Sequence, residues 1–234
     1  MRVRDISWGL VGAICVFGAA IAQADDSALD FDDETVRINY SLGYQIGGDF
    51  KRQQVEMNPD MLLQGFEDAT GGDKPLMTEQ EMATVLSNLA TRVQAAQMEK
   101  LKKQATENLK AGEAFLADNS EKAGVTTLPS GLQYKVITAG TGKSPQKSDK
   151  VTVHYRGTLI DGTEFDSSYS RNKPATFGVG QVIPGWTEAL QLMKEGDKWE
   201  LVVPSKLAYG ERGAGARVPA NSTLVFEVEL ISVN

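Results

Sequence analysis

The chain has 234 residues, of which 41% are hydrophobic, and carries 24 Lys and Arg against 31 Asp and Glu, a net charge of -7. The hydrophobic content is sufficient for a packed core and excludes wholesale disorder, and a net negative chain is a poor partner for nucleic acid. A single His, His154, and a single Cys, Cys15, exclude Cys/His zinc sites. We therefore expect no metal and no cofactor, so that any catalysis depends on the shape and dryness of a site.

Residues 1–24 have the pattern of a secretory signal peptide. Arg2 and Arg4 precede an apolar run over residues 9–22, and Ala22-Gln23-Ala24 follows as a small-residue cleavage pattern. The apolar run is short for a membrane-spanning helix. We expect the exported chain to begin at Asp25, and the alternative is an uncleaved anchor helix.

Residues 25–77 are predicted to form a helical domain. Apolar side chains recur at spacings of three and four from Val36 to Phe50, and Asn58-Pro59 is typical of the start of a second helix, which Gly71-Gly72 ends. About 50 residues bury little apolar surface by themselves. The sequence therefore predicts a homodimer through residues 32–70. The alternative is a monomeric helical subdomain that folds on the next helix.

Residues 78–118 are predicted to form one long connecting helix. Thr78 and Glu81 have the spacing of a capping box, and the segment contains no Pro and a single glycine, Gly112. The apolar spacing is regular from Met82 to Val93 and sparser afterwards. We expect the first half of this helix to pack against another surface and the second half to be largely solvated.

Residues 119–234 change from helical spacing to the alternation of strands. Strands are predicted over residues 132–138, 151–159, 198–204 and 223–232, with a short helix over residues 184–193. Asp161-Gly162 indicates a hairpin turn, and alternation places His154 on a solvated face, opposite Tyr155. The fold class is therefore α+β, an antiparallel sheet wrapped on a short helix and preceded by an all-α part and a long helix.

Five short motifs in this half of the chain occur in a fixed order. They are Val153-His154-Tyr155-Arg156-Gly157, Asp161-Gly162-Thr163-Glu164-Phe165-Asp166-Ser167-Ser168, Gln181-Val182-Ile183-Pro184-Gly185-Trp186, Leu207-Ala208-Tyr209-Gly210 and Leu224-Val225-Phe226-Glu227-Val228-Glu229-Leu230. Together they resemble the FKBP family of peptidyl-prolyl cis-trans isomerases, over about residues 125–234. With its signal peptide, helical segment and long helix, the whole chain resembles the macrophage infectivity potentiator (Mip) group of Gram-negative bacteria. The resemblance implies a dimer, a periplasmic or outer-membrane location and an association with virulence.

The resemblance also implies a proline pocket. Its lining positions match Tyr155, Phe165, Asp166, Phe177, Val182, Ile183, Trp186, Tyr209, Val218 and Phe226. Trp186 is implied as the floor, the Ile183 amide and the Tyr209 hydroxyl as ligands of substrate carbonyls, and Asp166 as part of the wall. Ala175 and Ala214 depart from the aromatic residue and the histidine of single-domain relatives, which alters the pocket rim.

An apolar aromatic pocket can catalyse rotation about an X-Pro bond without a nucleophile. The twisted amide is less polar than the planar one, so a dry site favours the twisted state. The implied substrates are proline-containing peptides and unfolded exported proteins, and the implied inhibitors are macrolides of the rapamycin type. Two alternatives are a chaperone that holds unfolded chains, with catalysis secondary, and a purely structural surface protein.

Overall fold

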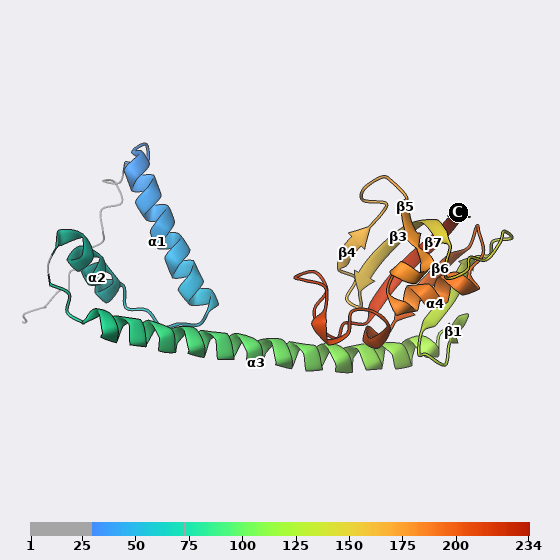
Figure 1. Cartoon of the computed structure of the whole chain (residues 1–234), viewed down its shortest axis with the longest axis horizontal. Coiled ribbons are helices and arrows are strands. Elements are labelled where there is room, and N and C mark those ends of the chain that lie inside the picture. The colour runs from blue at the N-terminus through green and yellow to red at the C-terminus, as the bar shows by residue number, and fades with distance from the viewer. Residues whose placement is uncertain (1–29, 73) are drawn as a thin grey trace, which may run out of the picture. The chain divides into compact units, whose positions relative to one another are not determined.

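The computed structural model describes residues 30–72 and 74–234, and the chain divides into two compact units between residues 73 and 74 (Figure 1). The predicted signal peptide, residues 1–24, lies outside the described residues. Within the described residues, no helix has the length and apolar character needed to cross a bilayer.

The first unit contains two capped helices. Helix α1 (Glu34–Arg52) starts after Asp33, whose carboxylate accepts a hydrogen bond of 2.7 Å from the Thr35 amide. Helix α2 (Pro59–Gly71) starts after Asn58, which accepts from the Asp60 amide at 3.0 Å, and ends at Gly72 in the left-handed conformation. Both helices were predicted, and the predicted start and end of α2 are confirmed, whereas the Asp33 cap of α1 was not predicted. Neither helix contains a buried residue.

Helix α3 (Glu79–Ser120) begins with the predicted capping box, in which the Thr78 amide donates to the Glu81 carboxylate at 2.8 Å. Most of its second half is exposed, as predicted, but one face of that half contacts the rest of the unit. Gly112 and Asn119 are buried, and the Asn119 side chain donates to the Gln133 side chain at 2.9 Å. This contact face combines glycine and amide side chains with the half-buried Phe115 and Leu116, so the sparse apolar pattern alone could not reveal it.

The second unit also contains a seven-stranded antiparallel sheet. Its strands are β1 (Val125–Thr127), β2 (Gln133–Thr138), β3 (Lys150–Leu159), β4 (Glu164–Ser167), β5 (Ala175–Gly178), β6 (Lys198–Val203) and β7 (Leu224–Val233). The order is β1-β2-β6-β7-β3-β4, and β5 also pairs with β3. The predicted strands are present, and Gly162 takes the left-handed conformation in the β3–β4 hairpin.

The core lies between the sheet and helix α4 (Pro184–Leu192). Trp186, Ala189 and Leu190 are the buried face of α4, and they pack with sheet residues that include Leu201 and Val228. Along β3, Val153 and Tyr155 are buried whereas His154 is half-buried, as the alternation predicts. The α+β architecture is confirmed, and it brings the Trp186 indole against aromatic rings from three strands, β3, β5 and β7.

Candidate active site

Trp186 lies at the centre of a cluster of aromatic rings. Its ring centroid is 5.3 Å from that of Tyr155 on β3, 5.3 Å from Phe226 on β7 and 6.0 Å from Phe177 on β5, and each of these rings stands nearly perpendicular to the indole. Phe165 on β4 packs edge-on against Phe226 at 5.6 Å. Edge-to-face contacts of this kind add about 0.5–1.5 kcal/mol each beyond the burial of area. The sheet and α4 therefore hold these five predicted rings together as one rigid apolar surface.

The cluster is dry at its base and open at its edge. Trp186 and Phe226 are each 4% exposed and Tyr155 is 5% exposed, whereas Phe165 and Phe177 are only half-buried. The other predicted aliphatic residues adjoin the same core: Val218 is buried, and Val182 and Ile183 are half-buried where the chain enters α4. The partly open rings and aliphatics surround the buried indole.

Asp166 is paired at the edge of the ring cluster. The Tyr155 hydroxyl donates to one carboxylate oxygen at 2.5 Å, and the Arg171 guanidinium contacts the other. Arg171 also donates to the Tyr155 hydroxyl at 2.8 Å. Asp166 thus has two partners, the Tyr155 hydroxyl and Arg171. These bonds fix the orientation of the Tyr155 ring. The backbone amide of Tyr155 also donates to the buried Ser168 hydroxyl at 2.8 Å.

The charges at the site resist titration near neutral pH. Burial raises the pKa of the Asp166 carboxyl, but the hydrogen bonds from Tyr155 and Arg171 outweigh burial, so its pKa lies below the ordinary value. Burial and the bond to Asp166 raise the pKa of the Tyr155 hydroxyl. Burial and the charge of Asp166 also raise the pKa of the Tyr209 hydroxyl.

Besides the buried Nε1–H of Trp186, two further hydrogen-bond donors at the site have no partner within the part of the chain that the structure describes. They are the hydroxyl of Tyr209, whose side chain is 40% exposed, and the backbone amide of Ile183. The Ile183 carbonyl is engaged, because it accepts from the amides of Trp186 and Thr187 at the start of α4. Both donors are thus free to bind carbonyl oxygens of another chain.

Other polar residues fall outside the ring cluster. His154 is stacked on Tyr169 at 4.6 Å, and its Nδ1 lies 2.9 Å from the Ser168 hydroxyl, so it supports the sheet away from the rings. Among residues 30–72 and 74–234, no group of three or more His, Cys, Asp or Glu is placed to hold a metal ion. Sequence reasoning did not predict the contact of Ser168 with the Tyr155 backbone, nor that of Arg217, which donates to the Phe165 carbonyl at 3.4 Å. A serine or arginine in a loop carries no pattern that would identify such a contact.

Comparison with known proteins identifies two family models. Residues 141–231 match the FKBP-type peptidyl-prolyl cis-trans isomerase model, and residues 35–136 match the domain amino-terminal to FKBP-type peptidyl-prolyl isomerase. The chain is 46% identical over 233 residues to the outer membrane protein MIP of Legionella longbeachae, covering 100% of this chain and 98% of the relative. It is 44% identical to the FKBP-type 22 kDa peptidyl-prolyl cis-trans isomerase of Escherichia coli, covering 87% and 97% of the two chains.

Solved structures agree with the sequence relatives. The crystal structure of FkpA from Escherichia coli superposes with a TM-score of 0.73 at 39% identity, over 88% of this chain and 99% of that one. The similarity therefore includes the helices that precede the sheet as well as the sheet itself. The chain belongs to the FKBP-type peptidyl-prolyl cis-trans isomerases and is an isomerase of that family.

Proposed function

We propose that the ring cluster around Trp186 is the proline site and that it accelerates rotation by excluding water. The observation that carries this proposal is the buried indole, 4% exposed, enclosed by three nearly perpendicular rings. The barrier to amide rotation, about 18–20 kcal/mol, reflects resonance. Twisting removes that resonance and leaves a less polar carbonyl and a more amine-like nitrogen. Water stabilises the planar amide better, so a dry site lowers the barrier.

Each residue of the site has a role in this proposal. Trp186 is the floor for the pyrrolidine ring, with Tyr155, Phe165, Phe177, Val182, Val218 and Phe226 as the walls. The free Ile183 amide and the free Tyr209 hydroxyl hold the substrate carbonyls on either side of the twisted bond. Asp166 orients Tyr155 and exchanges no proton. A rate gain of 10⁵ needs only about 7 kcal/mol of preference for the twisted state.

A protease-coupled isomerisation assay on the full chain tests the roles of the site. Tyr209→Phe removes the free hydroxyl and keeps the ring, and we expect kcat/KM to fall by roughly threefold to tenfold, which corresponds to one hydrogen bond. Tyr169→Phe is the matched control, because Tyr169 is also partly exposed but bonds Glu229 on the sheet. An unchanged kcat/KM in Tyr209→Phe would remove Tyr209 from the site. An equal loss of kcat/KM in Tyr169→Phe would show that the effect comes from a disturbed fold and not from the lost Tyr209 hydroxyl.

A holding function for unfolded chains is a second proposal. It rests on exposed apolar side chains along α3, where Leu86 and Met98 are each 63% exposed and Val85 is 55% exposed. The double variant Asp166→Leu/Tyr209→Phe should lower kcat/KM by about 30-fold to 100-fold and still suppress aggregation of a substrate protein without proline. If aggregation is no longer suppressed when isomerisation slows, holding is not separate from catalysis. If refolding limited by proline isomerisation is unaffected by both substitutions, the proposed site is wrong.

We also propose a domain organisation in which residues 25–77 form a dimerisation domain, residues 78–118 a connecting helix and residues 119–234 the isomerase domain. The apolar side chains of the first two helices support the dimer, because Tyr44 is 76% exposed, Phe66 65% and Tyr40 59%. A soluble monomer rarely leaves so many rings in water on two short helices. Sedimentation of the full chain at micromolar concentration tests this, and a monomer would refute it.

Export to the periplasm or outer membrane is proposed from the pattern of residues 1–24 and from the name of the Legionella longbeachae relative, an outer membrane protein. Amino-terminal sequencing of the protein from a cell-envelope fraction should start at Asp25. A chain that retains Met1 would contradict removal of a signal peptide.

Macrolides of the rapamycin type are proposed to occupy the proline site, and they should compete with substrate peptides.

A further inference from the structure

One loop separates the proposed proline site from helix α3. It runs from Gly210 to Asn221, and its ends are joined by a hydrogen bond of 2.8 Å from the Asn221 amide to the Gly210 carbonyl. Inside the loop, the Ala214 amide donates to the Val218 carbonyl at 2.8 Å. Gly213, at φ +63°, is required there, because a Cβ atom would lie 2.4 Å from the Val218 carbonyl oxygen. The loop is therefore a compact closed unit, whose position depends on what holds its base.

The inner side of this loop belongs to the proposed site. Val218 is 3% exposed and lies in the same buried cluster as Trp186 and Phe226. Arg217 donates to the Phe165 carbonyl, and Tyr209 immediately precedes the loop. A shift of the loop would move the aliphatic wall and the free Tyr209 hydroxyl together.

The outer side of the loop is tied to α3 by two amides that bond in opposite directions. The Asn108 side chain on the helix donates to the Ala220 carbonyl of the loop at 2.9 Å. The Asn221 side chain at the end of the loop donates to the Ala105 carbonyl of the helix at 3.4 Å. We call this pair of bonds the amide clamp. All of these residues are half-buried, so water competes only partly for the bonds.

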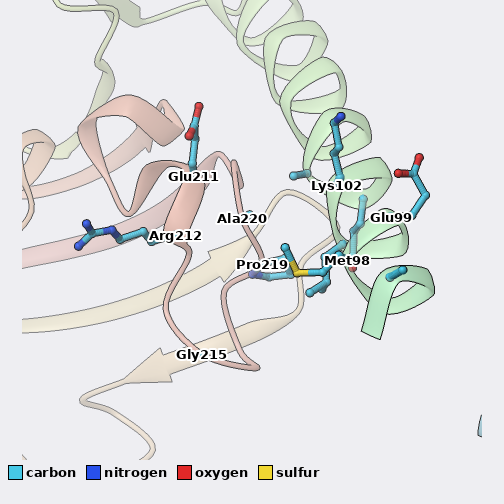
Figure 2. Close-up of a pocket in the computed structure, with 12 residues that line it drawn as sticks. Met98, Glu99, Lys102, Glu211, Arg212, Gly215, Pro219 and Ala220 are labelled. Atoms are coloured by element: carbon cyan, nitrogen blue, oxygen red, sulfur yellow. The ribbon is translucent and has the colours of Figure 1, made fainter. Parts of the chain in front are cut away.

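Beyond the amide clamp, the helix and the loop separate. They leave a groove of about 810 Å³, in which Met98 and Lys102 of the helix stand on one side and Gly215 and Pro219 of the loop on the other (Figure 2). The outer part of the loop therefore has an open space beside it, and the base is where the helix fixes the loop. Helix α3 itself is anchored to the sheet by the close approach of Gly112 to Thr223 and by the bond from Asn119 to Gln133.

We propose that Asn108 is a positioning residue for the isomerase reaction, which acts by fixing the loop that carries Val218 and follows Tyr209. The proposal rests on the proposed proline site. In this proposal, helix α3 holds the loop of the site in place in addition to connecting the two parts of the chain. The loop and the Tyr209 hydroxyl then contribute binding to the planar and the twisted state alike, whereas the preference for the twisted state comes from the Trp186 floor and the aromatic rings. Displacement of the loop then weakens both states equally. Such a uniform loss of binding raises KM and leaves kcat unchanged.

The test uses the full chain with three substitutions and one control. Asn108→Asp has the same shape but presents an acceptor to the Ala220 carbonyl, and Asn108→Ala removes the side chain. Asn221→Gly removes the second amide of the clamp and retains the left-handed backbone, since Asn221 has φ +59°. The control is Asn88→Asp, an exposed amide on the same helix.

We expect the two Asn108 variants to raise KM for a proline tetrapeptide by about threefold to tenfold, with kcat within about twofold of the unaltered chain. The Kd for rapamycin, followed by tryptophan fluorescence, should rise by a similar factor. Hydrogen exchange at the Ala214 amide should accelerate. Asn221→Gly should change KM and Kd in the same direction by a smaller factor, and Asn88→Asp should change neither.

Two results would separate the possible failures. If the unaltered chain isomerises the peptide and binds rapamycin, but both Asn108 variants keep its KM and Kd while their Tm falls, the amide clamp is structural and the inference is wrong. If the unaltered chain fails to isomerise the peptide, the proposed site itself is wrong. A hydrogen-exchange rate at Ala214 that is unchanged in Asn108→Asp would also overturn the inference, without recourse to activity.

Discussion

Asp166 provides the sharpest test of how the ring cluster is held. Its carboxylate accepts from the buried Tyr155 hydroxyl at 2.5 Å and contacts Arg171. Asp166→Asn removes the charge but keeps a carbonyl that can accept from one of these donors. Asp166→Leu removes the acceptor altogether, and it leaves the Tyr155 hydroxyl with Arg171 as its remaining partner.

The cost of each substitution follows from these contacts. The side chains of Asp166 and Arg171 are 41% and 51% exposed, so their ion pair contributes at most about 1 kcal/mol after screening by solvent. The hydrogen bond from Tyr155 contributes about 1–1.5 kcal/mol. We therefore expect Asp166→Leu to lower the free energy of unfolding by about 2 kcal/mol and Asp166→Asn by about 1 kcal/mol at pH 7.

The pH dependence of this stabilisation has a definite sign. The pKa of Asp166 is lowered in the folded chain, so its contribution is present above the pKa of the unfolded carboxyl, about 3.9, and is lost as pH falls through the lower folded value. Both variants lack this loss. The difference in unfolding free energy between the unaltered chain and either variant should therefore shrink in strong acid.

Activity separates an orienting role from a chemical one. If Asp166 only fixes the Tyr155 ring, Asp166→Asn should keep kcat/KM within about threefold, while Asp166→Leu should lose about tenfold, or 1.4 kcal/mol. Urea unfolding at pH 7 and pH 3 and the protease-coupled assay supply both measurements. A loss in Asp166→Asn as large as in Asp166→Leu would refute the reasoning, because the charge itself would then be required.

Three further predictions concern packing and assembly. Gly157→Ala should lower the free energy of unfolding by about 1–3 kcal/mol and should also lower kcat/KM, because the added Cβ would lie 2.7 Å from the Phe165 ring and 2.8 Å from the Phe226 ring. Urea unfolding and the peptide assay measure the two effects, and an unchanged kcat/KM would contradict the role of the rings. Trp186→Ala should lower the free energy of unfolding by about 3–5 kcal/mol and abolish rapamycin binding, measured by calorimetry. If the variant binds rapamycin normally, Trp186 is not the floor of the site. Tyr44→Glu should shift the full chain towards monomer in sedimentation with kcat/KM on a tetrapeptide unchanged, and a persistent dimer would place the interface elsewhere.

Much of the fold was predictable because its signals are local. Asn58 and Thr78 are capping residues whose side chains bond within their own first turn, so the starts of α2 and α3 follow from the sequence. Alternation likewise predicts which side of β3 carries Tyr155. The short strands β1, β4 and β5, of three or four residues, had no predicted ranges, because they are defined by their neighbours β2 and β3 more than by their own pattern.

The arrangement of the site was predictable only in part. The aromatic residues belong to motifs, so the resemblance names Trp186 and Tyr155 in advance, and their mutual packing is a result of the sheet register. The amide clamp at Asn108 joins residues 112 positions apart. An asparagine in a helix is equally compatible with solvent, so nothing in its sequence neighbourhood predicts a partner in a distant loop.

The central claim is that the site excludes water and moves no proton, and the solvent isotope effect on kcat/KM tests it most directly. The pKa of Asp166 is lowered and the pKa values of Tyr155 and Tyr209 are raised, so these groups keep one protonation state through the neutral range. We predict a solvent deuterium isotope effect of about 1 and a flat profile from about pH 5.5 to 8.5. An isotope effect of about 2 or more, with a bell-shaped profile over that range, would show proton transfer in the rate-limiting step and contradict the account.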